Sequence, residues 1–317
     1  MLKKWYSIAV LFVLSAVVFT CSTNINEKGA DTATYGTIKI ASDESFQPLV
    51  DAELDVFHAL YQYAKVGIVY KPEDAAIDEM LKDSVRLVFT TRQLNEREKA
   101  VFDAAKITPR VNKVAIDGVA LIVNNANMDS MLTMKQLKSI FKGEATDWKQ
   151  FSKLNNSGSI QIVFDNGNSS NLRYISDKFA CDSTDRKRFF SAGGNKEVVD
   201  YVKNNKGALG VIGVNWISDG DDSTSKSFTN TVKVVAVSDK ENPKKSEYYQ
   251  PYQAYMAQNW YPLSRELFVI SREARVGLGT GFAAFVVSDR GQRIVLKSGL
   301  VPANVPLRIV NVKNKMP

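Results

Sequence analysis

Hydrophobic positions along the chain alternate between two spacings, and this alternation predicts an α/β fold. Short runs rich in β-branched residues are typical of buried strands. Between them lie segments whose apolar residues recur every three or four positions, as on one face of a helix. The first such pair is an expected strand at 36–41 followed by an expected helix from about Phe46. This order is typical of parallel sheets covered by helices.

The same alternation continues through most of the chain. The expected strands that follow are 66–70, 85–90, 113–115, 118–124, 160–164, 208–212 and 232–237. The expected helices are 72–82, one after Asn95, one capped by Thr133, one from about Ser170, and 197–205. The polar stretch 218–231 is expected to be a surface loop.

The N-terminus has the pattern of a secretory signal. An apolar run at 8–19 follows Lys3 and Lys4. The run is too short for a membrane-spanning helix, which needs roughly 20 residues. We therefore expect the protein to be exported.

Cys21 directly follows this signal. Residues 18–21, Val-Phe-Thr-Cys, resemble a bacterial lipobox, in which the cysteine is acylated after cleavage. We expect a signal peptide at 1–20, lipidation of Cys21 and a flexible polar stalk over 21–35, which would hold the protein on a membrane, in the periplasm or at the cell surface. An ordinary signal peptide that ends at a chance cysteine is the alternative.

Composition and charge exclude several functional classes. Loss of Lys3 and Lys4 lowers the formal charge from +7 to +5, and the basic residues form no run like a nucleic-acid footprint. Mild basicity suits an anionic small ligand. With Cys21 acylated, Cys181 has no disulfide partner, and His58 is the only histidine. We therefore expect no zinc site, no Ser-His catalytic pair and no cofactor.

Three loops that follow expected strands share a polar character. They are Ser42-Asp43-Glu44-Ser45, Thr90-Thr91-Arg92 and the segment 165–173. In open α/β sheets ligands bind beyond the carboxyl ends of strands, where helix N-termini present unpaired N–H groups. The candidate anion ligands are Ser45, Thr90, Thr91, Arg92, Ser169, Ser170, Asn171 and Arg173, with Glu44 and Asp165 as further candidates. Helix capping is the alternative explanation of each loop taken alone.

Arginine strengthens the anion hypothesis. Arg92 and Arg173 lie in two of these loops, and a guanidinium makes paired hydrogen bonds to phosphate or carboxylate. The alternative is that both are solvated surface arginines.

Several longer stretches carry a family resemblance that covers nearly the whole chain after the signal. They are 36–41 with Pro48-Leu49, 116–124, 132–143 with Asp147-Trp148, Tyr261-Pro262-Leu263-Ser264-Arg265 and 285–292. With these stretches the chain resembles phosphate-binding proteins of the PstS-like branch, the extracytoplasmic substrate-binding components of ABC importers.

The resemblance implies a two-lobed periplasmic-binding-protein fold of type II. Each lobe would be a mainly parallel sheet flanked by helices, and crossing hinge strands would join the two. Lobe I would comprise 36–116 and 243–317, and lobe II would comprise 117–242. The implied function is binding of phosphate or a related small oxyanion between the lobes, by a monomer that delivers it to an ABC transporter permease.

The binding loops depart from the family pattern. Where the family tends to show Gly-Ser-Ser-Thr, only Ser45 keeps the hydroxyl expected to touch phosphate. Asp165 stands where the third loop usually has arginine, and Arg173 lies two positions beyond that motif. A Ser-Gly loop expected after the strand at 66–70 is replaced by Lys71-Pro72-Glu73-Asp74.

These departures leave the ligand open. Carboxylates at Asp43, Glu44 and Asp165 would repel an anion, although one of them can accept a hydrogen bond from protonated phosphate and so reject sulfate. Either Arg92 and Arg173 rebalance the charge, or the ligand is another oxyanion, a phosphorylated molecule or a molecule with a cationic group. A divergent sensor or adhesion lipoprotein that does not bind phosphate is the second hypothesis. An enzyme is the third.

Overall fold

The computed structural model describes residues 31–218 and 231–306. Cys21, the expected signal peptide at 1–20, the stalk as far as residue 30 and residues 219–230 of the expected surface loop lie outside the described residues. Among the described residues, no helix is both long enough and apolar enough to cross a membrane.

One ten-stranded sheet runs through the described chain, in the order β2-β1-β3-β11-β4-β8-β6-β7, with β9 and β12 also paired to β4. Its strands are β1 (Gly36–Asp43), β2 (Ala64–Lys71), β3 (Leu87–Thr90), β4 (Arg110–Asn124), β6 (Gln161–Phe164), β7 (Phe189–Ser191), β8 (Ala208–Gly213), β9 (Val232–Val234), β11 (Ser264–Ser271) and β12 (Val301–Pro302). A separate pair joins β5 (Met131–Thr133) to β10 (Ala236–Ser238).

Helices follow most of the strands, as the sequence pattern predicts. The α-helices are α2 (Gln47–Leu60), α3 (Glu73–Leu81), α4 (Glu96–Ala104), α5 (Met134–Phe141), α6 (Ser170–Phe179), α7 (Ser183–Arg186), α8 (Asn195–Asn204), α9 (Asn215–Ser218), α11 (Gln253–Ala257), α12 (Leu278–Val286) and α13 (Asp289–Lys297). Short 3-10 helices are η2 (Glu44–Phe46), η3 (Trp148–Gln150) and η4 (Lys245–Glu247).

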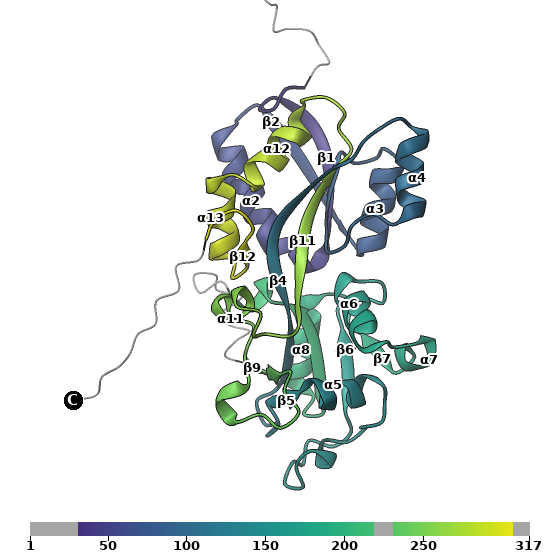
Figure 1. Cartoon of the computed structure of the whole chain (residues 1–317), viewed down its shortest axis with the longest axis vertical. Helices are drawn as coiled ribbons and strands as arrows, with labels where there is room; N and C mark the ends of the chain where they lie inside the picture. Colours follow the sequence, from purple (N-terminus) through teal and green to yellow (C-terminus); the bar gives the residue numbers. More distant parts are fainter. Residues whose placement is uncertain (1–30, 219–230, 307–317) are drawn as a thin grey trace, which may run out of the picture. The chain divides into compact units, whose positions relative to one another are not determined.

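We call β2, β1, β3, β11 and the first part of β4 the first half-sheet. Its side chains alternate between two hydrophobic cores: Ile40 packs into one core, while its neighbour Ala41 packs into the other. In Figure 1, α2, α12 and α13 lie on one side of these strands, and α3 and α4 lie on the other. Burial on both faces explains the continuous apolar run 87–89 of the central strand β3.

Strand β4 corrects one sequence expectation. The expected strands at 113–115 and 118–124 form a single strand, Arg110–Asn124. Asp117 interrupts the apolar pattern, but its carboxylate pairs with Arg265, the residue opposite it on β11. Because the charge is paired inside the sheet, the strand continues through it. The expected strand at 232–237 instead divides into β9 and β10.

The second part of β4, with β8, β6, β7 and β9, forms what we call the second half-sheet. Residues 119–123 of β4 pair antiparallel with β8, while β6 pairs in parallel with β8 and β7. Strand β4 therefore belongs to both half-sheets, and Figure 1 shows β4 and β11 running between them. The lobe boundaries at 116/117 and 242/243 stay a prediction.

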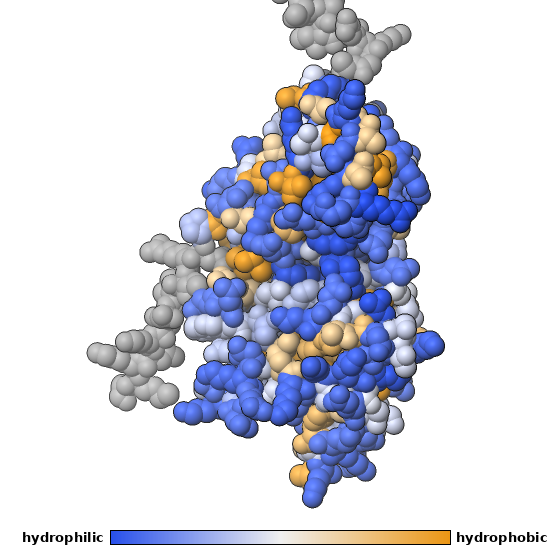
Figure 2. All heavy atoms as spheres, turned by 45° about the vertical axis from the view of Figure 1, so that its right-hand side comes forward, coloured by the Kyte–Doolittle hydropathy of each residue, from blue (hydrophilic) through white to orange (hydrophobic). Residues whose placement is uncertain are grey.

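The surface seen in Figure 2 is largely hydrophilic, with hydrophobic residues in small separated groups. Among the described residues, the large hydrophobic side chains that are exposed come from many elements, Tyr63 and Leu154 among them. Isolated exposed apolar residues are ordinary on soluble domains and identify no interface by themselves.

Gly210 tests the packing of the second half-sheet. A Cβ atom at Gly210 would lie 2.7 Å from Val202 Cγ2 of α8 and 2.8 Å from Ile122 Cγ1 of β4. We expect Gly210→Ala to lower the free energy of unfolding by about 1–3 kcal/mol, because overpacking a dense core forces side chains from their rotamers. Urea unfolding followed by circular dichroism measures this change.

Gly67 on the edge strand β2 offers the matched control, since a Cβ atom there would meet only Ile38 O, at 3.8 Å. Gly67→Ala should leave the urea midpoint close to that of the wild type. Equal unfolding free energies for the two variants would show that α8 packs less tightly on β8 than described.

Candidate functional site

The polar loops at the carboxyl ends of β1 and β6 meet, although they are far apart in sequence. Ser45 Oγ, just after β1, donates a hydrogen bond of 3.1 Å to Asp165 Oδ2, which directly follows β6. These two residues are 120 positions apart and both are buried. The sequence prediction that these loops converge at strand ends agrees with this arrangement.

Ser45 lies at the centre of the cluster. Its hydroxyl accepts hydrogen bonds from Asn171 Nδ2 at 3.0 Å and Ser170 Oγ at 3.5 Å. Its carbonyl oxygen accepts from Asn215 Nδ2 at 2.8 Å and Trp216 Nε1 at 3.0 Å. Groups from the second half of the chain thus supply these contacts to the hydroxyl and carbonyl of Ser45.

The carboxylate of Asp43 lies at the N-terminal end of α6 and accepts hydrogen bonds there. Its Oδ2 accepts from the backbone N–H of Ser170 at 3.1 Å, and its Oδ1 accepts from Ser170 Oγ at 2.9 Å and from the N–H of Ser45 at 3.0 Å. An N-terminal N–H group of a helix favours negative charge. The carboxylate therefore uses donors that a bound oxyanion would also use.

Asp165 and Glu44 are held mainly by side-chain amides. Asp165 Oδ2 accepts from Asn171 Nδ2 at 3.0 Å and from Asn195 Nδ2 at 3.2 Å, and its Oδ1 accepts from Ser169 Oγ. Glu44 Oε2 accepts from Asn195 Nδ2 at 2.7 Å. Asn195 was not predicted as a site residue, because a lone asparagine at the start of a helix gives no sequence signal beyond capping.

These carboxyl groups bind protons more tightly than usual. Burial, followed by the charge of Asp165, raises the pKa of Glu44 to about 7. Burial, followed by the charge of Asp43, raises the pKa of Asp165 to about 6. Burial also raises the pKa of Asp43, with Glu73 as the next cause. Near neutral pH the cluster therefore holds protons that isolated carboxylates would release.

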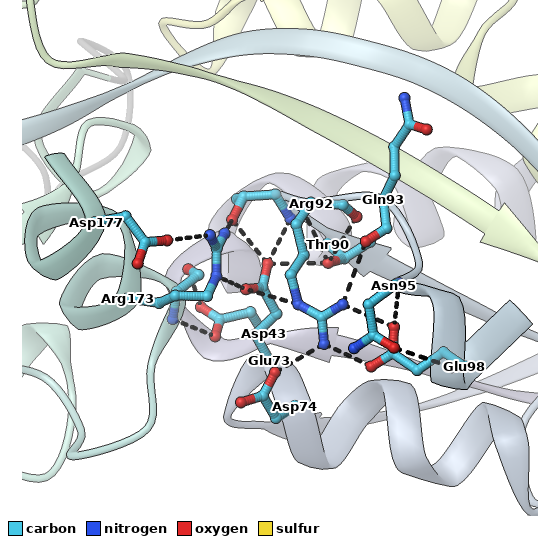
Figure 3. A network of polar contacts seen from close by, with 12 residues as sticks. Asp43, Glu73, Asp74, Thr90, Arg92, Gln93, Asn95, Glu98, Arg173 and Asp177 are labelled. Atoms are coloured by element: carbon cyan, nitrogen blue, oxygen red, sulfur yellow. Dashed lines mark hydrogen bonds and ion pairs between the residues drawn. The ribbon is translucent and has the colours of Figure 1, made fainter.

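A second group of donors surrounds Glu73 at the start of α3 (Figure 3). Glu73 Oε1 accepts from Thr90 Oγ1 at 2.9 Å, from the N–H of Thr91 at 2.6 Å and from Thr91 Oγ1 at 2.7 Å. Glu73 Oε2 accepts from Arg173 Nε at 2.6 Å. Arg173 Nη2 also donates to Thr91 Oγ1 at 2.7 Å. The predicted hydroxyls of the second loop and the predicted arginine of the third thus converge on one carboxylate.

Both predicted arginines are paired with carboxylates. Arg92 donates two hydrogen bonds of 2.8 Å to Glu98 and one of 2.9 Å to Asp74. Its Nε lies 4.0 Å from Glu73 Oε2, at the margin of the group. Arg173 reaches Asp177 at 3.2 Å as well as Glu73. Their charges are already balanced, so they do not offset Asp43, Glu44 and Asp165.

Arg265 is a buried cation of the site that the sequence analysis missed. Its Nε donates to Asp117 Oδ2 at 2.9 Å and its Nη1 donates to Ser170 Oγ at 3.2 Å. The guanidinium lies over the rings of Phe46 and Tyr174, at 5.2 Å and 5.9 Å from the centroids. Within the described part of the chain, Nη2 is buried without a hydrogen-bond partner.

A signal for Arg265 did exist, because it ends the stretch 261–265 that carries part of the family resemblance. Pairing with a buried acid on the neighbouring strand could not be seen in one sequence. Asn215, which holds the carbonyl of Ser45, gave no signal at all.

Sequence comparison finds relatives that match most of this chain. The phosphate-binding protein PstS of Staphylococcus epidermidis is 24% identical over 296 residues, covering 92% of this chain and 87% of that relative. The phosphate-binding protein PstS of Staphylococcus aureus strain USA300 is 23% identical over 295 residues, covering 92% of this chain and 86% of that relative.

Solved structures share the fold. A structure with bound phosphate from Clostridium perfringens, assigned as a phosphate ABC transporter substrate-binding protein, matches with a TM-score of 0.70 and 21% identity, covering 84% of this chain and 100% of that chain. An ABC-type phosphate transport receptor from Vibrio cholerae matches with a TM-score of 0.62 and 22% identity, covering 84% and 100%. These matches confirm the predicted two-lobed α/β fold.

The family assignment covers most of the sequence. Residues 28–290 match the PBP superfamily domain, and this span is more than half of the 317 residues. The chain therefore belongs to the PBP superfamily.

Proposed function

We propose that this protein is an extracytoplasmic substrate-binding protein that binds phosphate or a related small oxyanion for ABC-importer uptake. The observation that carries the proposal is the meeting of Ser45, Ser170 and Asn171, buried hydroxyl and amide donors from loops that follow β1 and β6. The names of the relatives, phosphate-binding protein PstS, support the same ligand.

The described contacts suggest how an oxyanion binds. Ser45 Oγ, Ser170 Oγ and Asn171 Nδ2 now donate to carboxylates or to one another. A phosphate between the half-sheets takes over these donors and the N–H groups at the start of α6. Arg265 adds positive charge beside Ser170, and its Nη2, which has no hydrogen-bond partner among the described residues, is a further donor. The ligand therefore replaces contacts that already exist.

Protonation gives the site a means to distinguish phosphate from sulfate. Sulfate has no proton to donate near neutral pH, whereas phosphate does. A carboxylate such as that of Asp43 accepts a hydrogen bond from that proton and repels an anion that lacks one. Buried polar groups left unpaired by the wrong ligand then lower its affinity.

The remaining parts of the proposal follow from the same assignment. The protein is not an enzyme and needs no cofactor; it acts as a monomer and delivers its ligand to a permease. It is exported and anchored by lipid at Cys21, in the periplasm or at the cell surface. Closure depends on β4 and β11 as hinge strands, since β4 pairs in both half-sheets. Hinge closure around a ligand is a common motion in two-lobed binding proteins.

One observation favours a second candidate, a divergent member that binds a different small ligand. In the described part of the chain, hydroxyl, amide and backbone donors hold Asp43, Glu44 and Asp165, and no lysine or arginine hydrogen-bonds to them directly. Such a cluster also suits a ligand that carries a cationic or strongly donating group. Titration with phosphate and sulfate separates the two candidates, because silence toward both anions from folded protein favours the second.

Ser45→Ala tests the proposed contact. The variant removes a hydroxyl shared by Asp165, Asn171 and Ser170. We expect phosphate affinity to weaken by about 1.5–3 kcal/mol, the usual value of a hydrogen bond to a charged group. Isothermal titration of the full chain, after removal of bound ligand by unfolding and refolding, measures this difference.

Ser139→Ala is the matched control, because Ser139 Oγ donates only to Gln136 O within α5. Its phosphate affinity should equal that of the wild type. If Ser45→Ala also keeps wild-type affinity, the anion does not bind at this cluster.

The raised pKa values predict that phosphate binding takes up protons. A bound anion raises the pKa of Asp165 above its ligand-free value of about 6 and that of Glu44 above about 7. The complex then holds more protons than the free protein, so lowering the pH through this range strengthens binding, by up to about tenfold per pH unit for each proton taken up. Calorimetry in buffers of different ionisation enthalpy counts these protons.

Asp165→Asn removes one titrating group and should flatten the pH dependence. Asp103→Asn, at an exposed position on α4, should leave it unchanged. Titration of phosphate itself also contributes to the slope of affinity against pH, and this contribution is the same for the wild type, Asp165→Asn and Asp103→Asn. Affinity that falls as the pH is lowered would contradict the proposed role of these carboxyl groups.

A further inference from the structure

Glu73 is a buried acid whose surroundings consist of the donors that an oxyanion needs. Its side chain is only 1% exposed. Two hydroxyls, one backbone N–H and one guanidinium point at its two oxygens, as Figure 3 shows. Hydroxyls, backbone N–H groups and arginine are also the usual donors to a bound phosphate.

The donors come from both sides of the proposed binding cleft. Thr90 ends β3 in the first half-sheet and Thr91 follows it, whereas Arg173 lies on α6 in the second half of the chain. Glu73 and Arg173 are 100 positions apart, and their contact measures 2.6 Å. The carboxylate therefore bridges two parts of the chain that a hinge would separate.

Capping of its own helix does not explain the position of Glu73. Acidic residues are favoured in the first turn of a helix, where α3 places Glu73. The backbone N–H that donates to its carboxylate, however, belongs to Thr91 in another loop. A role at the helix end alone would not require Thr91 or Arg173.

We propose that the Glu73 carboxylate is a built-in substitute for the ligand anion. It occupies oxyanion donors of Thr90, Thr91 and Arg173, and it holds the two half-sheets together when no ligand is bound. This inference rests on the proposed function, because it assigns these donors to the same anion site. Glu73 stands in the segment 71–74 that replaces the Ser-Gly loop expected there by family resemblance.

The charges around Glu73 support this role. Burial alone would raise the pKa of Glu73, but Arg173 and the donors of Thr91 bring it below the ordinary value of a glutamate. The side chain is therefore an anion whenever its bridge is formed. Nearby, Glu73 helps to raise the pKa of Asp43, which shows that the two groups share one electrostatic environment.

Competition between Glu73 and the ligand has a definite consequence. An incoming phosphate must displace the carboxylate from Arg173 before it can use the same donors, so part of its binding energy is spent on that exchange. A neutral side chain of the same shape competes less well for a guanidinium. Glu73→Gln should therefore bind phosphate more tightly than the wild type, although its ligand-free form is held together less firmly.

The experiment compares the full-length wild type, Glu73→Gln and the control Glu79→Gln, with two measurements on each. Glu79 also lies on α3, but its carboxylate accepts from Lys71 and not from Thr90, Thr91 or Arg173. The first measurement is the phosphate Kd by isothermal titration. The second is fluorine NMR of 5-fluorotryptophan-labelled protein, in which Trp216 reports closure because its Nε1 donates to Ser45 O. Trp216→Phe assigns that signal.

We expect Glu73→Gln to lower the phosphate Kd by between about 5-fold and 150-fold, the usual range of coupling between binding events. Its Trp216 signal should shift without phosphate and return toward the wild-type position when phosphate is added. Glu79→Gln should match the wild type in both measurements. Should Glu73→Gln fail to fold, Glu73→Asp serves instead, because its shorter side chain cannot hold Thr91 and Arg173 together and should change both readouts in the same direction.

The remaining outcomes separate this inference from the proposed function. Equal Kd values for wild type and Glu73→Gln would overturn the inference and leave phosphate binding intact. A weaker Kd for Glu73→Gln would make Glu73 a ligand contact and would also overturn it. If no variant binds phosphate, the proposed function fails, and the NMR signal alone tests the inference about Glu73. An unshifted Trp216 signal in Glu73→Gln overturns the bridge, whereas a shifted signal supports it.

Discussion

The site depends on one constraint: a buried carboxylate must find hydrogen-bond donors, and here some of the donors come from a distant part of the chain. Asp43 and Glu73 belong to the first part of the chain, but Ser170 and Arg173 on α6 satisfy them. In return Asp165 accepts from Ser45. An uncompensated buried charge costs several kcal/mol, roughly 3–5 when one partner of a pair is removed. These hydrogen bonds between the two parts of the site therefore stabilise the arrangement in which the parts are in contact.

The ion pair of Asp117 and Arg265 places this exchange on the strands that connect the two half-sheets. Both residues are buried, and they lie opposite each other on β4 and β11. Because Arg265 also donates to Ser170, the start of α6 is tied to the crossing strands themselves. Under the proposed function, a change at the anion site would be only one hydrogen bond away from the strands proposed as the hinge. A short chain of packed polar groups can couple two sites without a long pathway of residues between them.

Local patterns predicted the parts of the fold that local chemistry determines. The helix from about Phe46, the helix at 72–82 and the strand at 208–212 were predicted to within a few residues, since each has its own apolar spacing and end signals. The continuity of β4 was missed, because Asp117 resembles a strand break until its partner on β11 is known. Two-lobed architecture came from the family resemblance rather than from periodicity.

The candidate site was predicted unevenly for the same reason. Loop positions at strand ends identified Ser45, Ser170 and Asn171, because the rule that ligands bind there needs only the order of elements. It could not show that Arg173 would meet Glu73 across 100 positions. Nor could it assign Glu73, which the sequence presents as an ordinary acidic residue in the first turn of a helix.

An anion can bind at a site lined with acids if it replaces the carboxylates at the hydrogen-bond donors that they now occupy. The donors are already used, so a ligand gains only the difference between its own hydrogen bonds and those of the carboxylates that it displaces. A planar carboxylate presents two oxygens, whereas phosphate presents four in a tetrahedron and can also donate a proton. Under the proposed function, phosphate would take over donors that Asp43 and Glu73 now occupy separately. Selectivity against sulfate, which has the same four oxygens, then comes from the proton that phosphate can donate.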